Sequence, residues 1–318
     1  MKISDILSER KDPFLSFEII PPARGRSARE IYEIIDELIE FKPPFIDVTS
    51  HAADSYFIEQ DNGTFTRHIK RKRPGTIGLC AAIKYRYQLE AVPHLLCQGF
   101  TKQETEDALI ELNYLGIDNV LAIRGDQLQY QKAHPMGREA NDYALDLVKQ
   151  ISNMNRSKYL EDILDADESD FCIGVGGYPE KHPDAPSKNA DIRYLKKKVD
   201  AGAQYIVTQM FFNNQDYYNF VDQCREEGIT VPIIPGIKLV TRKTQLRSLP
   251  HAFSVNIPDE LVTSLELAET SHERAEIGIK HALEQCEDLL NNGVECLHFY
   301  IMQDVHLVKQ VARSLNIS

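Results

Sequence analysis

The chain lacks any long apolar stretch. Its 318 residues contain no run of about 18 or more apolar side chains, which is the length that a membrane-spanning helix needs. The first residues, Met1 to Asp5, also lack the apolar core of a secretory signal peptide. We therefore expect a cytoplasmic protein that makes no membrane contact.

Positive charge is scarce. Lysine and arginine together number 36 and aspartate and glutamate 48, which gives a formal net charge of −12. General nucleic-acid binders and proteins that bind anionic membranes need a basic face that displaces counterions. The composition therefore disfavours both classes of partner, although a local basic site could still bind a small anion.

Two common signatures of metal and cofactor binding are absent. The six cysteines form no C-x-x-C pair and have no histidines at a matching spacing. This favours buried free thiols over zinc ligands and disulfides. No G-x-G-x-x-G motif opens a helix, because Gly174 to Gly177 is followed by Tyr178 and Pro179. A Rossmann dinucleotide-binding domain is therefore disfavoured.

A glutamate stands inside the first predicted strand. The segment Phe14 to Pro22 reads Phe-Leu-Ser-Phe-Glu-Ile-Ile-Pro-Pro, and alternation along a strand puts Ser16 and Glu18 on one face. The two prolines have no N–H with which to continue a ladder, so Glu18 lies near the carboxyl end of the strand. In parallel barrels that end carries the chemistry. The alternative is a structural glutamate that is hydrogen-bonded to a neighbouring strand.

A helical stretch that ends in glycine and precedes an apolar run recurs along the chain. Glycine suits the left-handed position that ends a helix, and the four positions are Gly116, Gly202, Gly228 and Gly293. Eight core strands are predicted in all: 14–20, 45–49, 92–97, 119–123, 171–176, 204–209, 231–237 and 296–300.

The segment between the second and third predicted strands contains a basic run. Residues His68 to Arg73 read His-Ile-Lys-Arg-Lys-Arg and precede Pro74. Cations suit a helix C-terminus and proline stops a helix, so we expect a helix that ends here. A contact with the negative tail of a substrate or with a nucleic acid is the alternative. Ile77 to Ala82 is predicted to form an outer strand.

Eight strands that alternate with helices fit a (β/α)8 barrel or an open doubly wound sheet. A barrel gathers all strand ends around one mouth, whereas an open sheet spreads them along a crevice. Polar residues end successive strands here: Glu18, Thr49, His94, Arg124, Asp126, Tyr178, His182, Gln209 and Lys238. We therefore predict an α/β fold, a (β/α)8 TIM barrel. Extra helices are expected in the long connection Thr241 to Asn292, between the seventh and eighth strands.

Two strand ends carry groups that could position a ligand. Arg124 to Asp126 places two opposite charges around a glycine, which allows close approach of the backbone to a ligand. The alternative is a structural ion pair. The loop Gly177 to Pro186 is braced by prolines and carries Tyr178 and His182, which is typical of a ligand-positioning loop.

A lysine cluster follows that loop. Lys196 to Lys198 could bind phosphate, and a solvated cluster is the alternative. Asp191 and Lys198 are seven residues apart, so they share a helical face.

Motifs along nearly the whole chain resemble, in family order, the catalytic barrel of methylenetetrahydrofolate reductase. The motifs are residues 16–22, 93–95, 121–126, 178–183, 195–203, 208–212, 233–237 and 298–300. The resemblance implies a single catalytic barrel domain over residues 1–318 and a homo-oligomer. It also implies FAD as cofactor, with NADH or NADPH as hydride donor for the reduction of 5,10-methylenetetrahydrofolate to 5-methyltetrahydrofolate. The chain ends soon after the eighth strand, so we expect no counterpart of the eukaryotic regulatory domain.

The resemblance also implies roles for single residues. Glu18 would be the general acid that protonates the folate as its methylene bridge opens, which requires a pKa raised by about two units. Asp126 would be the second catalytic residue, beside the flavin and the folate, where its negative charge would disfavour the anionic reduced flavin and so favour departure of the hydride. Gln209 would contact nicotinamide and folate in turn, and Gln245 the folate. The implied FAD-binding residues are Thr49, Ala52, His94, Arg124, Gly125, Asp126, Ala144, Tyr178, His182, Ala185, Asp191, Lys197 and Lys198.

Some positions depart from the pattern that this resemblance implies. Leu249 stands where an aromatic residue often stacks on the folate, and Asp304 stands at an arginine position. The run Lys70 to Arg73 is a substitute partner for the folate's glutamate tail. The alternative functions are a non-catalytic flavin- or folate-binding subunit of a larger complex and a different flavin barrel. Both are disfavoured, because the chain keeps Glu18 and the other matched site residues.

Overall fold

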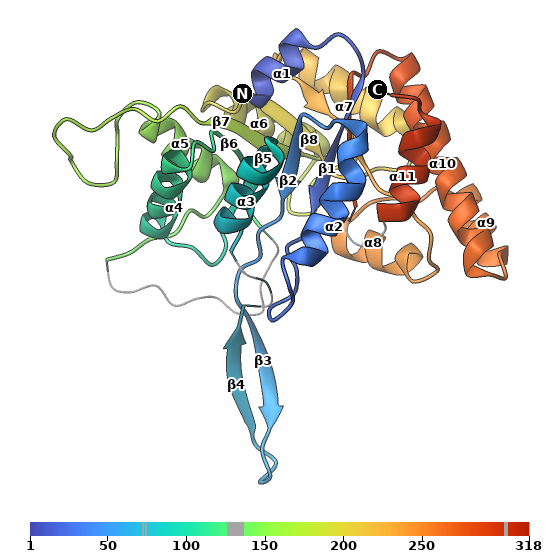
Figure 1. Cartoon of the computed structure of the whole chain (residues 1–318), viewed down its shortest axis with the longest axis horizontal. Helices are drawn as coiled ribbons and strands as arrows, with labels where there is room; N and C mark the ends of the chain where they lie inside the picture. Colours follow the sequence, from blue (N-terminus) through green and yellow to red (C-terminus); the bar gives the residue numbers. More distant parts are fainter. Residues whose placement is uncertain (72, 74, 126–136, 302–304, 318) are drawn as a thin grey trace.

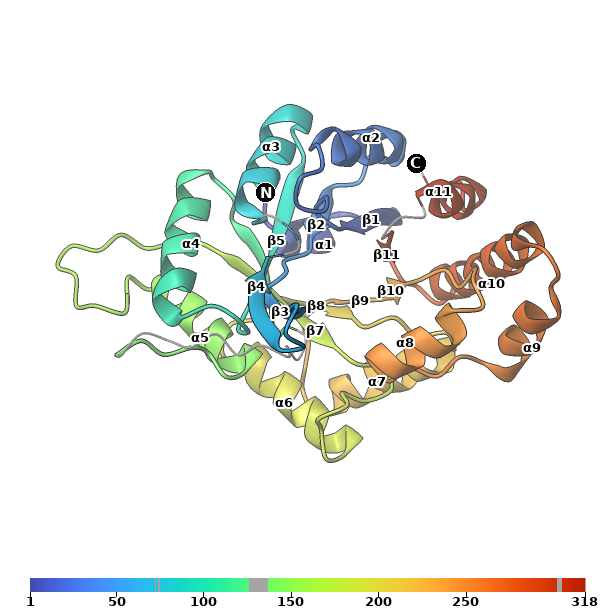
Figure 2. The same cartoon turned by 90° about the horizontal axis from the view of Figure 1, so that it is seen from below.

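Eight parallel strands surround one axis, and helices cover them on the outside (Figures 1 and 2). This computed structural model describes residues 1–71, 73, 75–125, 137–301 and 305–317. Neighbouring strands pair in sequence order, and the last strand pairs with the first. The first six and the last are β1 (Phe14–Ile19), β2 (Phe45–Val48), β5 (Glu90–Leu96), β6 (Asn119–Ile123), β7 (Cys172–Gly177), β8 (Tyr205–Thr208) and β11 (Cys296–Tyr300). The predicted (β/α)8 TIM barrel is confirmed.

The seventh strand is split by a proline and closes the barrel. Its first half, β9 (Ile233–Ile234), pairs with β8, and its second half, β10 (Gly236–Ile237), pairs with β11. Pro235 lies between them and lacks the N–H of a continuous ladder. Its carbonyl still accepts a hydrogen bond from the His298 N–H at 3.1 Å. The strand predicted over 231–237 is therefore shorter and interrupted, and it joins both edges of the sheet.

The outer helices alternate with the strands. They are α2 (Arg29–Leu38) with the 3-10 turn η1 (Ile39–Phe41), α3 (Ile77–Tyr87), α4 (Lys102–Tyr114), α5 (Ala144–Met154), α6 (Lys188–Asp200), α7 (Asn214–Glu226), α10 (Ser271–Asn291) and α11 (Val305–Ser314). Four of them end at a predicted glycine with positive φ: Gly116 (+61°), Gly202 (+126°), Gly228 (+80°) and Gly293 (+83°). The helix–glycine–strand pattern is therefore confirmed.

The barrel strands divide their apolar side chains between two cores. On β1, one set of alternate residues joins the core between sheet and helices: Leu15, Phe17 and Ile19. Phe14 instead joins a second core inside the barrel. The helix α1 (Ile3–Glu9) closes the amino end of the barrel by adding Ile3 and Ile6 to this inner core. Since apolar residues fill that end, the polar residues of the strands are left to the carboxyl end.

Two further helices lie between the seventh and eighth strands, as predicted. They are α8 (Gln245–Phe253) and α9 (Asp259–Leu267), which precede α10. Leu249 of α8 and Leu265 of α9 pack with Met210 and Phe212, which follow β8, in a separate apolar cluster. The extra helices therefore sit against the segment that leaves one barrel strand.

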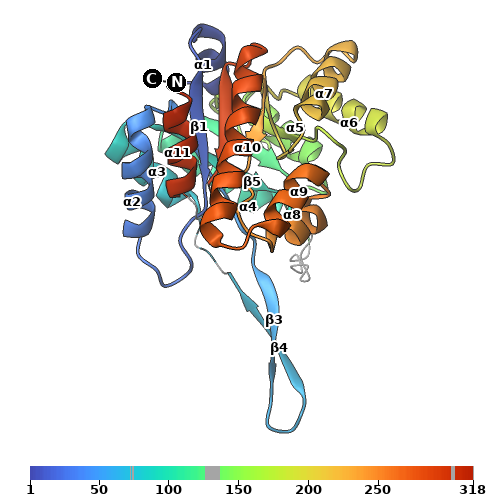
Figure 3. The same cartoon turned by 90° about the vertical axis from the view of Figure 1, so that its right-hand side faces the viewer.

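An antiparallel hairpin stands where we expected the helix that ends at the basic run. Its strands are β3 (Asp54–Glu59) and β4 (Phe65–Lys70), and it projects from the barrel (Figures 1 and 3). The Gln60 N–H bonds the Thr64 carbonyl at 2.8 Å, and the glycine of Asn62–Gly63 adopts φ +74°. The helix prediction was wrong because an Asn-Gly turn between aromatic and β-branched residues is a strong hairpin signal.

The outer strand predicted at 77–82 was also wrong. These residues begin α3, whose Cys80 and Ile83 are buried. Cys80, Ile83 and Tyr87 recur at helical spacing, which the shorter apolar run concealed. The helix ends where Gln88 takes a left-handed conformation, with φ +53°.

All six cysteines are buried and unpaired, as predicted. Among the helices that the structure describes, none combines the length and the apolar character that a bilayer crossing requires. Within the same residues, no three histidine, cysteine or carboxylate side chains are grouped so that they could hold a metal ion.

Gly236 lies where barrel closure leaves no room for a side chain. A Cβ there would stand 2.4 Å from the Thr208 carbonyl oxygen and 2.5 Å from the Tyr300 ring. We expect Gly236→Ala to lower the free energy of unfolding by about 2 kcal/mol or more, because the backbone must shift. Gly176→Ala is the control, since a Cβ at Gly176 meets nothing within 4 Å. Urea unfolding compares the two, and equal stabilities would contradict this account of closure.

Candidate active site

The carboxyl ends of the strands surround one mouth, which Figure 2 views from the side of the projecting hairpin. Parallel pairing places Glu18 of β1 opposite Asp47 of β2 on one side and Tyr300 of β11 on the other. His94 of β5 follows on the far side of β2. The closed sheet thus brings together side chains that lie far apart in the sequence.

Glu18, His94 and Asp47 form a compact ionisable cluster. His94 Nε2 lies 3.6 Å from Glu18 Oε2 and 3.4 Å from Asp47 Oδ2. The side chains of His94 and Asp47 are 4% and 0% exposed, whereas that of Glu18 is 15% exposed. Glu18 is therefore the member of the cluster that solvent or a ligand can reach.

The environment of the cluster shifts two of its pKa values. Burial raises the pKa of Glu18 to about 7; the charge of His94 opposes this rise and that of Asp47 adds to it. Burial lowers the pKa of His94, but the hydrogen bond with Asp47 and the charge of Glu18 outweigh burial, so the net shift is upward. An acid whose pKa lies near neutrality is suited to donating a proton at physiological pH.

Asp47 was missed from the sequence, although a signal for it existed. In the strand Phe45 to Thr49, the alternation that puts Phe45 in the inner core also turns Asp47 and Thr49 inward. Asp47 Oδ1 is buried and has no hydrogen-bond partner among the described residues. A second carboxylate therefore lies behind the first.

The wall beside Glu18 is formed by β10 and β11. Lys238, which follows β10, donates from Nζ to the Tyr300 carbonyl at 3.0 Å, and its charge lowers the pKa of Glu18. The Tyr300 hydroxyl donates to the Thr208 carbonyl at 2.5 Å. Lower in the barrel, His298 Nδ1 lies 2.9 Å from Ser16 Oγ, and burial lowers the pKa of His298 to about 4. His298 is therefore neutral, and the positive charge on this wall belongs to Lys238.

Arg124 ends β6 and pairs with the loop that follows β7. Its guanidinium lies 2.6 Å from Asp184 Oδ2 and stands over the Tyr143 ring at 5.2 Å. Arg124 Nε is buried without a partner among the described residues. Gly125 has φ +85°, a left-handed conformation that a side chain would strain. Asp126, predicted to be catalytic, lies outside the described residues.

The proline-braced loop is held by hydrogen bonds. Tyr178 and His182 meet edge to face, with centroids 4.5 Å apart. Asp191, in the first turn of α6, accepts a hydrogen bond from the His182 N–H at 2.8 Å, and the Ala185 carbonyl accepts one from Lys181 at 2.7 Å. Burial lowers the pKa of His182, which keeps the ring neutral. The loop is thus fixed to the start of α6.

The structure separates the two lysines predicted to contact FAD. Lys198 points toward the barrel and donates to the Gly176 carbonyl at 2.9 Å, and burial lowers the pKa of its ammonium to about 8. Lys197 is exposed and stands over the Tyr194 ring at 5.6 Å. Adjacent helical residues differ in direction by about 100°, so the two lysines face different surroundings.

The remaining predicted residues have mixed surroundings. Gln209 follows β8, and its Oε1 accepts a hydrogen bond from the Met210 N–H at 2.9 Å. Gln245 Oε1 accepts from the N–H groups of Thr241 and Arg242 at 2.8 and 2.9 Å, so it ties the segment before α8 to the first residue of that helix. The hydroxyl of Thr49 is buried and has no partner among the described residues. Ala52 follows β2, and Ala144 is the first residue of α5.

The basic run lies at the base of the hairpin, and Leu249, which departs from the family pattern, lies under α8 and α9. Arg73 donates to the Pro21 carbonyl, and Arg71 stands over the Phe100 ring at 5.6 Å. Both residues therefore attach the base of the hairpin to the barrel. Leu249 is buried in the cluster under α8 and α9, and Asp304 lies outside the described residues.

The family model described as methylenetetrahydrofolate reductase matches residues 2–316. The chain belongs to this family. The 5,10-methylenetetrahydrofolate reductase of Escherichia coli is 31% identical over 304 residues, which is 95% of this chain and 90% of that protein. The predicted resemblance is therefore confirmed.

Other members of the family are longer. The Arabidopsis thaliana protein "Methylenetetrahydrofolate reductase (NADH) 1" is 33% identical over 311 residues, which is 95% of this chain and 48% of that protein. The chain thus spans about half the length of this relative. Among solved structures, an uncharacterised Clostridium thermocellum protein that binds two copies of 5-methyl-5,6,7,8-tetrahydrofolic acid has a TM-score of 0.59 at 13% identity, covering 99% of both chains. That likeness shows a shared fold.

The raised pKa of Glu18 predicts a pH-dependent stability. Between an unfolded pKa of 4.5 and a folded pKa of about 7, the folded chain holds a proton that the unfolded chain has lost. Stability should therefore fall as pH rises through this window, by about 3 kcal/mol in all. Glu18→Gln removes this dependence, so the variant should gain stability relative to the wild type between pH 5 and pH 8. Urea unfolding at several pH values measures the difference, and a constant difference would count against a neutral, buried Glu18.

Proposed function

We propose that this chain is an FAD-dependent methylenetetrahydrofolate reductase. It would reduce 5,10-methylenetetrahydrofolate to 5-methyltetrahydrofolate with NADH or NADPH, as a single catalytic domain over residues 1–318 of a cytoplasmic homo-oligomer. One observation carries the proposal: in a chain of this family, the most accessible member of a largely buried cluster is a carboxyl group, Glu18, whose pKa is raised to about 7.

Glu18 serves as the general acid. Its proton goes to the folate as the methylene bridge opens. Behind Glu18, His94 Nε2 lies 3.6 Å from the carboxyl group of Glu18 and 3.4 Å from that of Asp47. When the proton has left, the carboxylate gains the attraction of the His94 imidazole, which supports its ionised form. Lys238 adds a second positive charge on the same side of Glu18. These groups therefore allow one carboxyl to be neutral before the transfer and charged after it.

The residues at the mouth fit a flavin nucleotide. Thr49 Oγ1 and Arg124 Nε are buried polar atoms that lack partners among the described residues, and Lys198 supplies a half-buried cation beside β7. FAD, when bound, accepts a hydride from the nicotinamide and passes it to the folate. The residues proposed to hold it are Thr49, Ala52, His94, Arg124, Gly125, Asp126, Ala144, Tyr178, His182, Ala185, Asp191, Lys197 and Lys198.

Three residues are proposed to contact the substrates. Asp126 would lie beside flavin and folate, Gln209 would contact nicotinamide and folate in turn, and Gln245 would contact the folate. Gln245 must do so through its amide nitrogen, because two backbone N–H groups occupy its oxygen. A non-catalytic folate-binding subunit would have no use for an acid with a pKa near neutrality.

If the chain binds a flavin, the purified protein should be coloured. Purified protein should absorb in the flavin region, NADH or NADPH should bleach that absorbance without oxygen, and 5,10-methylenetetrahydrofolate should restore it. Anaerobic spectrophotometry follows both steps. Protein that takes up no FAD from solution, or reduced flavin that the folate leaves bleached, would refute the assignment.

Loss of the general acid should slow one half-reaction and leave the other nearly unchanged. Glu18→Gln keeps the size and burial of the side chain but supplies no acidic proton. We therefore expect flavin reduction by NADH or NADPH to change by about twofold or less, and reoxidation by the folate to slow by about 100-fold or more. Glu276→Gln, at an exposed position on α10, is the matched control. If stopped-flow traces showed folate-driven reoxidation at the wild-type rate in Glu18→Gln, another group would be the acid.

A further inference from the structure

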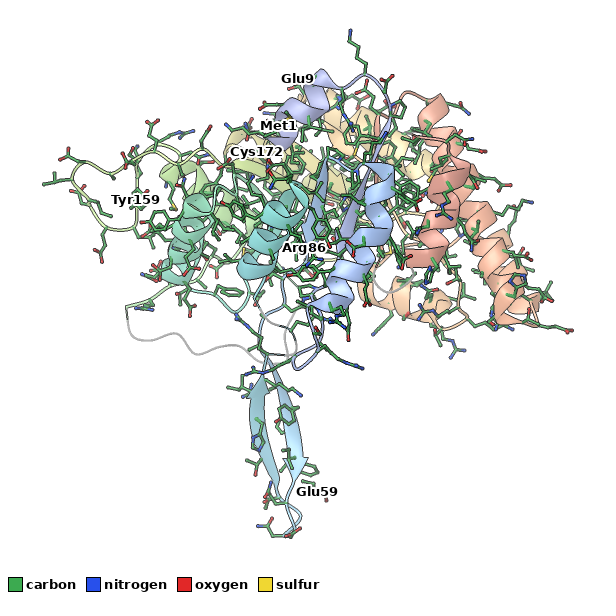
Figure 4. All side chains as sticks on the ribbon, in the orientation of Figure 1. Met1, Glu9, Glu59, Arg86, Tyr159 and Cys172 are labelled. Carbon is green, nitrogen blue, oxygen red and sulfur yellow. The ribbon has the colours of Figure 1, made fainter. Side chains whose placement is uncertain are left out.

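Asp47 is a carboxylate that solvent does not reach. Its side chain is 0% exposed, and the strand register places it opposite Glu18. It lies near the carboxyl end of β2, the end from which the hairpin labelled at Glu59 projects, and away from Met1 at the amino end (Figure 4). A buried charge is costly unless a partner compensates it. Asp47 therefore needs a partner inside the barrel.

His94 is the partner that the structure gives to Asp47. Its Nε2 lies 3.4 Å from Asp47 Oδ2 and 3.6 Å from Glu18 Oε2, so one ring nitrogen stands between two carboxyl groups. A carboxylate only accepts hydrogen bonds, so the ring must carry a proton on Nε2 to bond Asp47. The same contact favours the charged ring, because a carboxylate stabilises an imidazolium. Asp47 thus fixes both the position of the proton and the charge of the ring.

A second buried histidine shows how the ring behaves without a carboxylate partner. His298 is 0% exposed and His94 4%. The Nδ1 of His298 bonds the hydroxyl of Ser16 at 2.9 Å, and burial lowers the pKa of His298 to about 4, although the charge of Asp47 opposes this. Burial also lowers the pKa of His94, yet the hydrogen bond with Asp47 and the charge of Glu18 turn the net shift upward. The two rings therefore differ in partner rather than in burial.

The other ionisable groups around the cluster do not take the place of Asp47. Lys238 stands beside Glu18 and donates to a carbonyl of β11, and β6 presents the apolar Leu121 opposite His94. Burial raises the pKa of four further side chains that the charge of Asp47 also affects, so they stay neutral: Cys80, Tyr205, Cys296 and Tyr300. Since Glu18 is neutral below about pH 7, Asp47 supplies the negative charge beside His94 there.

We propose that Asp47 is a positioning residue for the proton transfer, because it keeps the N–H and the positive charge on His94 Nε2. The O–H bond of Glu18 breaks and its proton goes to the folate, while His94 and Asp47 neither gain nor lose a proton. The new carboxylate of Glu18 then faces an imidazolium that is already in place. This inference rests on the proposed function, because it assigns a role within that reaction.

NMR of protein with isotope-labelled histidine measures the charge of His94 directly. In the wild type, the pKa of His94 should lie above the ordinary value for histidine and that of His298 below it. In Asp47→Asn, the midpoint of His94 should fall by about one pH unit or more, because a neutral Glu18 leaves the effect of burial unopposed. The signal of His94 is assigned by its loss in His94→Gln. His298 should stay neutral in both proteins and serves as the internal control.

The two half-reactions test the consequence for catalysis. At about pH 7, Asp47→Asn should slow reoxidation of the flavin by the folate about tenfold or more, because the Glu18 carboxylate would form beside a neutral ring. Flavin reduction by NADH or NADPH should change about twofold or less, since Glu18 takes no part in it. Asp162→Asn, at an exposed position between α5 and β7, is the matched control and should leave both rates and the His94 midpoint unchanged. Stopped-flow spectrophotometry measures the rates.

The contrary results separate this inference from the proposed function. If the folate fails to reoxidise the wild-type flavin, the proposed function is wrong and the role of Asp47 in the transfer falls with it. If the wild type completes both steps but Asp47→Asn keeps the wild-type reoxidation rate, Asp47 is not a positioning residue. Slower reoxidation with an unmoved His94 midpoint would show a structural role instead. A wild-type His94 with a pKa below the ordinary value would also overturn the inference, and that measurement does not require the variant to fold.

Discussion

The burial of one carboxyl group beside an imidazole and a second carboxylate is the interaction on which the site depends. A charge is costly in a dry interior unless partners compensate it, and Glu18 meets this condition by holding a proton up to about pH 7. His94 lies between the two carboxylates, within 3.6 Å of one and 3.4 Å of the other. The cluster is therefore close to balance between two protonation states, which is the property that a proton donor needs.

Closure of the barrel creates this arrangement. Glu18, Asp47 and His94 come from three adjacent strands, and the wall beside Glu18 forms because β10 pairs with β11 and β11 with β1. The amino end is filled by apolar residues and by α1, so it contributes stability. The carboxyl end carries the polar groups and the loops. This division between a stable end and a reactive end is characteristic of the fold.

Segments outside the barrel serve other purposes. The hairpin β3–β4 and the loop of residues 158–170 contribute little to the inner cores, yet they carry much of the exposed apolar surface. Insertions at strand ends leave the barrel undisturbed, since they begin and end at points that the sheet fixes.

The sequence by itself determined the features that depend on local periodicity. Alternation turned Glu18 inward, glycines ended four helices, and the polar residues at successive strand ends favoured a barrel over an open sheet. The family motifs predicted that His94, Arg124 and Lys198 belong to one site. The prediction of a helix before the basic run was wrong, because it rested on the positive charge expected at a helix end and overlooked the Asn62–Gly63 turn of a hairpin.

Only the tertiary structure decided which distant groups meet. Asp47 became part of the cluster through the pairing of β1 with β2, and Asp184 became the partner of Arg124 across two strand ends. Lys197 and Lys198 are neighbours in the sequence, but helix packing leaves the first exposed and the second half-buried. The physical reason is that periodicity fixes the direction of a side chain within its own element, whereas its partner, its burial and hence its pKa depend on elements that fold against it from elsewhere in the chain.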